Sequence, residues 1–302
     1  MPVLGNYLAV ILIWSTTPLA IKLSNGSLSA YAAVLSRMLL AFLLTAVVIA
    51  MIKHVAGLKR KHWRLYWVAS LGLFPNMLLV YMAANYIPSG LISVLFAMVP
   101  IISGVLGAVV LKEPFFVARK ILALALAITG LLVVFASQWS LGKDAFIGIG
   151  LMLIANLVFS ISQVGTRYLQ KETHIDALEQ TFGSLTFALP GFFLTWWLMD
   201  GGMPSEVSMQ SLWAVIYLAV VGSLLGFVAY FVILRQLSLA LVSVIPLITP
   251  VLALWLGAAV LSEVITTQLM VGSALIILAL AAYDEAFSNV IRKRSFNLSV
   301  KL

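Results

Sequence analysis

Two stretches of this sequence, IPSGLISVLFAMVPIISGVLGAVVLKEP at residues 87–114 and LSLALVSVIPLITPVLALWLGAAVLSEV at residues 237–264, are variants of one pattern. Aligned position by position, they share a proline, a glycine and a terminal glutamate at the pairs Pro100/Pro250, Gly107/Gly257 and Glu113/Glu263. Each stretch holds an apolar run of about 20 residues, the length that a helix needs to cross the hydrocarbon core of a bilayer. The chain is therefore predicted to contain an internal repeat made of membrane helices.

The composition of the whole chain points to the membrane as well. Of its 302 residues, 63% are hydrophobic and only 9% are charged, whereas a soluble domain carries about a quarter charged residues. A water-soluble globular enzyme is excluded, because so few charges cannot cover its surface. The absence of cysteine from the sequence also excludes disulfide bonds, thiolate metal sites and cysteine nucleophiles.

Apolar runs of this kind occur ten times along the chain, and no alternating strand pattern competes with them. We therefore predict an all-α membrane protein with ten transmembrane helices. The first run lacks the basic flank and the small-residue cleavage site of a signal peptide, so we expect it to be retained. The predicted spans are residues 3–23, 31–52, 65–86, 90–111, 118–136, 146–167, 178–199, 212–234, 240–261 and 268–287.

The distribution of basic residues predicts how these spans are oriented. Cytoplasmic loops of membrane proteins are enriched in lysine and arginine. With the N-terminus in the cytoplasm, 15 of the 18 Lys and Arg residues fall on the cytoplasmic side, and the other three are Lys22, Arg37 and Lys143. We predict a multi-pass protein of the inner membrane with both termini in the cytoplasm. Its basic stretch at residues 59–64 is expected to contact anionic lipid rather than nucleic acid.

Each half of the chain contains five predicted spans, and an odd number inverts the second half relative to the first. The predicted units are a first five-helix repeat at residues 1–137, a second, inverted repeat at residues 146–287, and a basic cytoplasmic tail at residues 288–302. Inverted repeats about an axis in the membrane plane are typical of transporters that open alternately to the two sides. The alternative is that duplication only enlarges a membrane scaffold.

Several motifs make the sequence resemble a known family. They are IWSTTPLAIK at residues 13–22, SRMLLAFLL at residues 36–44, VVLKEP at residues 109–114 and AVLSEV at residues 259–264. In their order and duplication they resemble the drug/metabolite transporter superfamily, in particular its EamA-type bacterial exporters. The resemblance implies a ten-helix bundle that exports amino acids or other small metabolites through a central cavity. Spans 1, 3, 4, 6, 8 and 9 would line this cavity, with spans 5 and 10 outside it. The sequence departs from many relatives at Phe159, where they carry tryptophan.

Polar and aromatic residues inside the predicted spans are the candidates for substrate binding. Trp14, Pro18 and Lys22 share one face of the first span, and Phe159 and Gln163 share one face of the sixth. An aromatic ring near mid-membrane can stack on a substrate, and polar groups in lipid should face a cavity or a neighbouring helix. The alternatives are snorkelling of the cation and hydrogen bonding between helices. The predicted substrate-binding residues are Trp14, Pro18, Lys22, Asn76, Tyr81, Asn85, Asn156, Phe159, Gln163 and Tyr230.

Three further residues are predicted to have structural or gating roles: Arg37, Pro100 and Pro250. A charge inside a span costs at least about 2.5–3.5 kcal/mol, so Arg37 needs a partner or water. Backbone carbonyls and the substrate are both open as that partner. Pro100 and Pro250 remove helical hydrogen bonds and bend their spans, which suits a rocking motion as well as plain packing.

No motif in the sequence indicates catalysis, a cofactor or a metal site. HExxH and GxSxG are absent, and histidine and carboxylate residues do not cluster. No Asp or Glu lies at the centre of a predicted span, and the histidines, His62 among them, lie in predicted loops. A proton-driven carrier usually needs such a group inside the membrane. We therefore expect facilitated diffusion or exchange rather than obligatory proton coupling.

Together these observations predict a membrane transporter that exports small organic metabolites by alternating access. Its expected partners are a small-molecule substrate and the lipid bilayer, and no oligomeric state is predicted. The aromatic and amide side chains of the candidate cavity favour aromatic or large neutral amino acids. One alternative is a carrier of phosphorylated or lipid-linked metabolites, which the scarcity of deep cations disfavours. Another is a non-transporting membrane scaffold or receptor.

Overall fold

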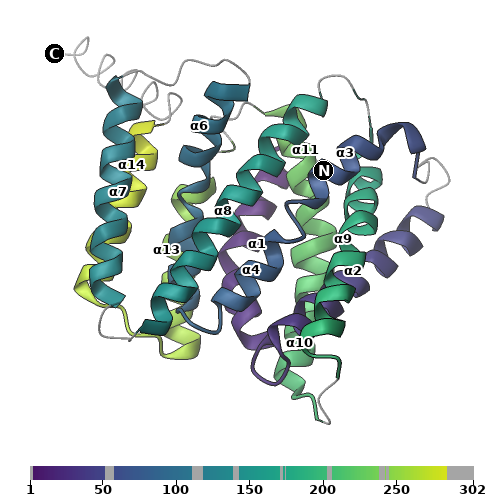
Figure 1. Cartoon of the computed structure of the whole chain (residues 1–302), viewed down its shortest axis with the longest axis horizontal. Helices are drawn as coiled ribbons and strands as arrows, with labels where there is room; N and C mark the ends of the chain where they lie inside the picture. Colours follow the sequence, from purple (N-terminus) through teal and green to yellow (C-terminus); the bar gives the residue numbers. More distant parts are fainter. Residues whose placement is uncertain are drawn as a thin grey trace.

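All regular structure in the described part of the chain is helical (Figure 1). The computed structural model describes residues 3–51, 58–110, 118–138, 143–170, 173, 175–202, 206–237, 242 and 245–283. For these residues the prediction of an all-α protein is confirmed. Glu113 and the predicted tail at residues 288–302 lie outside the described residues.

The helices follow the predicted apolar runs. The first half of the chain contains α1 (Val3–Ser24), α2 (Ala30–Met51), the 3₁₀ helix η1 (Arg60–His62), α3 (Trp63–Ser70), α4 (Asn76–Ala83), α5 (Ser89–Phe96), α6 (Val99–Val110) and α7 (Ala118–Gln138). The second half contains α8 (Lys143–Gln170), α9 (Ala177–Met199), α10 (Met209–Tyr217), the π-helix η3 (Leu218–Leu225), α11 (Gly226–Gln236), α13 (Ile245–Leu261) and α14 (Thr267–Tyr283). A helix or a run of consecutive helices lies at each predicted span.

Six of the described helical segments are long and apolar enough to cross a bilayer. They are Val3–Ser24, Ala30–Met51, Ser89–Val110, Asp144–Gln170, Ala177–Met199 and Met209–Gln236. Large apolar side chains face outward along the helices, among them Leu12, Val109 and Trp197 with 63%, 76% and 62% of their surface exposed. An apolar surface of this kind belongs in lipid rather than in water. The chain is thus a multi-pass membrane protein, while ten crossings stay a prediction.

The helices α1 and α8 form the middle of the molecule. α1 packs against α5, α10, α11 and α13, and α8 packs against α3, α4, α5 and α6. On one side α2 packs against α9, and on the opposite side α7 and α14 run along each other (Figure 1). This last crossing is close, because a Cβ atom at Gly130 would lie 2.8 Å from the carbonyl oxygen of Gly272. Small residues allow membrane helices to approach in this way.

The third and eighth predicted spans are both irregular, and at matching places. α3 ends at Ser70 and α4 begins only at Asn76, while the eighth span widens into a π-helix at residues 218–225. Gly72 and Gly222 lie inside these two segments, separated by the 150 residues that relate the quoted stretches. The predicted span at residues 65–86 is therefore interrupted, whereas the one at residues 212–234 is helical throughout with a π-helical segment.

Side chains compensate for the break in the third span. Irregular backbone inside a membrane needs hydrogen-bond partners from the protein itself. The Asn76 amide Nδ2 donates to the Gly72 carbonyl at 2.9 Å, and the Ser162 hydroxyl of α8 donates to the Val68 carbonyl at 2.9 Å. The break is thus held by its own segment and by the central helix α8.

Candidate functional site

Four aromatic rings from four helices meet in the interior. The ring centroid of Trp14 in α1 lies 5.3 Å from that of Tyr230 in α11 and 6.2 Å from that of Phe159 in α8. Phe159 lies 6.0 Å from Tyr230 and 6.4 Å from Phe96, which ends α5. These separations are typical of favourable ring pairs. We call Trp14, Phe96, Phe159 and Tyr230 the aromatic cluster. Trp14 and Phe159 are only partly buried, so the aromatic cluster keeps some accessible ring surface.

Gln163 of α8 supplies hydrogen-bonding groups beside the aromatic cluster. Its Nε2 donates to the Tyr230 hydroxyl at 3.1 Å, and its Oε1 accepts from the Ser103 hydroxyl at 2.8 Å. All three side chains are buried. Because these bonds join α6, α8 and α11, they fix the position in which Tyr230 presents its ring to Trp14.

Asn156, two turns before Gln163, is fully buried against the junction of α5 and α6. Its Nδ2 donates to the Leu95 carbonyl at 2.7 Å, and the Ser160 hydroxyl donates to the Val99 carbonyl at 3.3 Å. These bonds lie on either side of the interruption at residues 97–98. They correspond to the helix-to-helix alternative for Asn156. Its Oδ1 is buried and has no hydrogen-bond partner among the described residues, so one acceptor atom is unused.

The candidates of the third span are not brought to one place. Asn76 is fully buried and bonds to its own segment, as described above. Tyr81 is fully buried with its ring facing Arg37. Asn85 lies beyond the end of α4 and is exposed, where its Oδ1 accepts from Asn25 Nδ2 at 2.9 Å. None of the three makes a ring contact or hydrogen bond to the aromatic cluster among the described residues.

Lys22, at the end of α1, belongs to a second polar group. Its Nζ donates to the Ile87 carbonyl at 3.0 Å and lies 3.7 Å from Oε1 of Glu263, just beyond α13. Pro18 is buried in α1, one turn before Lys22. Because proline has no N–H, the carbonyl of Trp14 one turn earlier lacks its usual helical donor.

The three residues assigned structural or gating roles occupy different settings. Arg37 in α2 has 1% of its surface exposed, and its Nε donates to the Ser223 hydroxyl of η3 at 2.9 Å. Within the described residues it makes no hydrogen bond to a backbone carbonyl. Pro100 lies in the first turn of α6, where a missing N–H is tolerated, whereas Pro250 lies inside α13.

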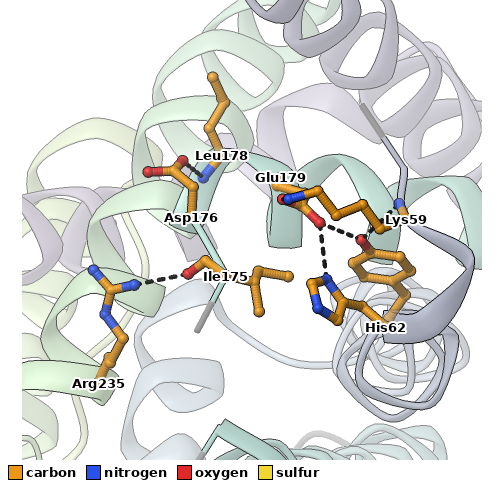
Figure 2. Close-up of polar contacts among 8 residues, drawn as sticks. Lys59, His62, Ile175, Asp176, Leu178, Glu179 and Arg235 are labelled. Atoms are coloured by element: carbon orange, nitrogen blue, oxygen red, sulfur yellow. Dashed lines mark hydrogen bonds and ion pairs between the residues drawn. The ribbon is translucent and has the colours of Figure 1, made fainter. Parts of the chain in front are cut away.

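Figure 2 shows a buried cluster that the sequence analysis did not identify. Oε1 of Glu179, in the first turn of α9, accepts from the Tyr66 hydroxyl at 2.6 Å and lies 3.0 Å from His62 Nδ1. The Lys59 ammonium lies 3.8 Å from Oε2. Glu179 and His62 are 3% and 6% exposed. His62 therefore ends a helix and is buried rather than part of a loop. The available signal was a lone glutamate at the start of an apolar span.

Two more contacts in Figure 2 fix the start of α9. Asp176 caps the helix, because its Oδ1 accepts from the Leu178 N–H at 2.7 Å. Arg235 at the end of α11 donates to the Ile175 carbonyl at 2.7 Å. Among the described residues, no group of three His, Asp or Glu side chains could hold a metal ion. The contacts of the Glu179 cluster (Lys59, His62, Tyr66 and Glu179) link α3 and the segment before it to α9.

A cavity of about 440 Å³ lies between α1, the α10–η3 segment and α13. Its lining is almost wholly apolar and includes Leu12 and Trp255, which are mostly exposed on the outer surface. Its polar lining residues are Ser15, Thr16 and Tyr217, and the hydroxyl oxygens of Thr16 and Tyr217 are 2.6 Å apart. None of the predicted substrate-binding residues lines this cavity.

Comparison with known proteins places this architecture in a family. The profile of the EamA-like transporter family matches residues 3–136 and again residues 146–283. The chain is 24% identical to the uncharacterized transporter YoaV of Bacillus subtilis, over 91% of this chain and 94% of the relative. It is 26% identical to protein PagO of Salmonella typhimurium, over 87% and 86% of the two chains. A solved crystal structure shares the fold with a TM-score of 0.67, over 94% of this chain and 97% of the other, at 17% identity.

Proposed function

This chain belongs to the EamA-like transporter family, and from that premise we propose that it exports small organic metabolites, most of all aromatic or large neutral amino acids, by alternating access. Its relatives include proteins named as transporters rather than enzymes. With its apolar helices, the chain is a multi-pass membrane transporter of a small-molecule substrate. The identity of the substrate and the mode of transport are the proposal.

The observation that carries the proposal is the aromatic cluster with Gln163 at its edge. It draws Trp14 and Phe96 from the first half of the chain and Phe159 and Tyr230 from the second half. Transporters built from repeats bind their substrate where the repeats meet, near the middle of the membrane. Rings suit an apolar or aromatic side chain, and amide and hydroxyl groups suit the polar part of an amino acid.

The repeat organisation is part of the same proposal. We propose inverted five-span units at residues 1–137 and 146–287, and the two family matches and the paired irregular segments of the third and eighth spans support it. The bias of basic residues supports an inner-membrane location with both termini in the cytoplasm. In this orientation Lys22 and Glu263 lie at the outer end of the molecule.

Transport by facilitated diffusion or exchange fits the charges of the described helices. Within the described residues, the carboxylates that bind a partner from another helical segment lie at helix ends and not at the middle of a span; they are Glu179, Asp200 and Glu263. A pathway for obligatory proton coupling would place a carboxylate or a histidine at the aromatic cluster. The aromatic cluster and its hydrogen-bond partners within the described residues are Trp, Phe, Tyr, Gln and Ser side chains.

Counterflow in liposomes tests the proposal. Purified protein is reconstituted into liposomes loaded with a mixed pool of unlabelled amino acids, and entry of a labelled amino acid is followed without any pH gradient. We expect transient accumulation of labelled aromatic or large neutral amino acids above the level of protein-free liposomes. Accumulation only under an imposed pH gradient would contradict exchange, and none with any amino acid would contradict the substrate class.

A further inference from the structure

Arg37 carries a positive charge that no group in the described structure balances. Its guanidinium is buried, and its well-aligned hydrogen bond within the described residues runs from Nε to the neutral hydroxyl of Ser223. Its Nη1 is buried without a hydrogen-bond partner. The ion pairs within the described residues use Lys22, Lys59 and His62 instead. A buried charge without a partner is strongly unfavourable, so the protein retains Arg37 for a reason other than stability.

A buried tyrosine hydroxyl lies beside this guanidinium. Tyr81 of α4 is fully buried, and its hydroxyl lies near the Arg37 guanidinium and the Ser24 hydroxyl without a well-aligned hydrogen bond to any described residue. The guanidinium carbon of Arg37 lies 6.0 Å from the centre of the Tyr81 ring. Arginine can only donate hydrogen bonds, and a tyrosine hydroxyl donates readily. The Tyr81 hydroxyl can also accept a hydrogen bond, but it is neutral and cannot balance the guanidinium charge. The component that would balance this charge is an anion.

Arg37 and Tyr81 lie at a place in the fold where a transporter of this design is expected to bind a ligand. Arg37 and Tyr81 come from the first half of the chain, and Ser223 comes from the π-helix of the second half. Gly222 lets the guanidinium rest against η3, because a Cβ there would lie 3.2 Å from Nη2. π-helical segments often mark functional positions. Irregular backbone at matching places of two repeats is where transporters of this design bind ions and substrates.

We propose that Arg37 and Tyr81 bind a small anionic group, either the carboxylate of the transported solute or a chloride ion, with Ser223 holding the guanidinium in position. A carboxylate can accept from Nη1 and from the Tyr81 hydroxyl, as charge-assisted hydrogen bonds do. Arg37 and Tyr81 are both buried in this structure. The anion therefore reaches them in another conformation, in which η3 has moved away from α2. The carboxylate form of this inference rests on the proposed function; the chloride form does not.

The first test measures binding without transport. Thermal unfolding of the protein in detergent is followed while chloride replaces isethionate at constant ionic strength, and separately while phenylalanine or phenylalaninamide is added. We expect chloride or phenylalanine, but not the amide, to raise the melting temperature of the wild type. Arg37→Gln should lose this rise and melt higher than the wild type in isethionate, because it removes an unbalanced charge. Lys61→Gln removes an exposed cation as the matched control and should behave as the wild type.

The second test separates the two sources of the anion and the role of each residue. In counterflow, the preference for phenylalanine over phenylalaninamide should fall about tenfold or more in Arg37→Gln if the carboxylate is bound. Tyr81→Phe should lower the preference less, and Arg37→Lys should retain part of it. An unchanged preference, with a chloride-dependent melting temperature, assigns the site to chloride.

Failure of the inference is distinct from failure of the proposed function. Absence of counterflow in the wild type would reject the proposed function, and the chloride titration would still decide the anion site. A melting temperature that neither chloride nor phenylalanine raises would overturn the inference. So would an Arg37→Gln protein that responds to both as the wild type does, or one that melts lower than the wild type in isethionate, since Arg37 would then be a structural residue.

Discussion

The backbone N–H of Ser89 donates a hydrogen bond to Oε1 of Glu263 at 2.8 Å, and the Ser89 hydroxyl donates to Oε2 at 2.9 Å. Glu263 thereby caps the start of α5 from the other half of the chain, where a carboxylate is favoured by the helix dipole. Lys22 adds a cation 3.7 Å from Oε1. Gly257 leaves room for the Glu263 carboxylate, because a Cβ atom at position 257 would overlap it. The group ties α1, α5 and α13 together at the predicted outer end.

Weakening this contact should open the predicted outer end. Glu263→Gln removes the negative charge and one of the two acceptor oxygens of this contact. We therefore expect the conformation that makes the contact to become less stable by the free energy of a charge-assisted hydrogen bond. A cysteine at the buried position Ile21 should then react about tenfold faster with a membrane-impermeant maleimide added from outside. The native chain has no cysteine, so the label reports this position alone.

Two variants make this accessibility experiment specific. Gly257→Ala displaces the Glu263 carboxylate without changing any charge and should also accelerate labelling. Glu206→Gln removes an exposed carboxylate and should leave the rate unchanged. Equal labelling rates in the wild type, Glu263→Gln and Gly257→Ala would show that the contact does not hold the outer end closed.

Gln163 should be needed for the order of the aromatic cluster. Gln163→Leu leaves the buried hydroxyls of Ser103 and Tyr230 without their partner, so it should lower the free energy of unfolding by about 2 kcal/mol. Tyr230→Phe removes one partner of Gln163 and should cost about 1 kcal/mol. Thermal unfolding in detergent measures both. A Gln163→Leu protein as stable as the wild type would speak against these bonds.

The Glu179 cluster should contribute to stability rather than to substrate selection. Glu179→Ala leaves the Tyr66 hydroxyl and His62 without their acceptor in a buried site, and we expect a loss of about 3 kcal/mol. Asp176→Ala removes only a helix cap and should cost about 1 kcal/mol. Counterflow should keep the same order of preference among amino acids in both variants. A changed order of preference would place Glu179 in the transport pathway.

The crossing of α7 and α14 depends on two glycines. A Cβ at Gly130 would lie 2.8 Å from the carbonyl oxygen of Gly272, so Gly130→Ala should force the helices apart. Cysteines placed at Ala127 and Ala279, which share one buried cluster, should form a disulfide efficiently in the wild-type background and poorly with Gly130→Ala. Gly150→Ala is the matched control, because nothing lies within 4 Å of a Cβ there.

The helices could be predicted from the sequence because lipid imposes a simple rule. A helix in a bilayer needs a long apolar run, and such runs are visible at residues 3–23 and 31–52, which became α1 and α2. The interruption before Asn76 was harder to predict, although Gly72 and Pro75 mark it, because membrane helices often carry both residues without a break. The family resemblance, carried by ordered motifs, is confirmed.

The side-chain contacts could be predicted only in part. Helical spacing placed Phe159 and Gln163 on one face, and both lie at the aromatic cluster. The contact of Glu179 with His62 joins residues 117 positions apart, and no periodicity within either segment encodes it. Helical spacing from Met77 and Tyr81 predicts Asn85 as a cavity residue, but α4 ends at Ala83. Asn85 therefore lies outside the helix and at the surface.

Counterflow with three proteins tests the central claim, that solutes pass through the aromatic cluster, most directly. Trp14→Ala removes the ring that contacts Phe159 and Tyr230, and Asn156→Ala removes the buried amide that binds the junction of α5 and α6. Trp197→Ala removes an exposed, lipid-facing ring of α9. Loss of one stacking ring should slow exchange about tenfold or more. We predict that Trp14→Ala and Asn156→Ala impair exchange of labelled amino acid while the proteins remain folded, and that Trp197→Ala exchanges as the wild type does. Normal exchange by both Trp14→Ala and Asn156→Ala would contradict the claim.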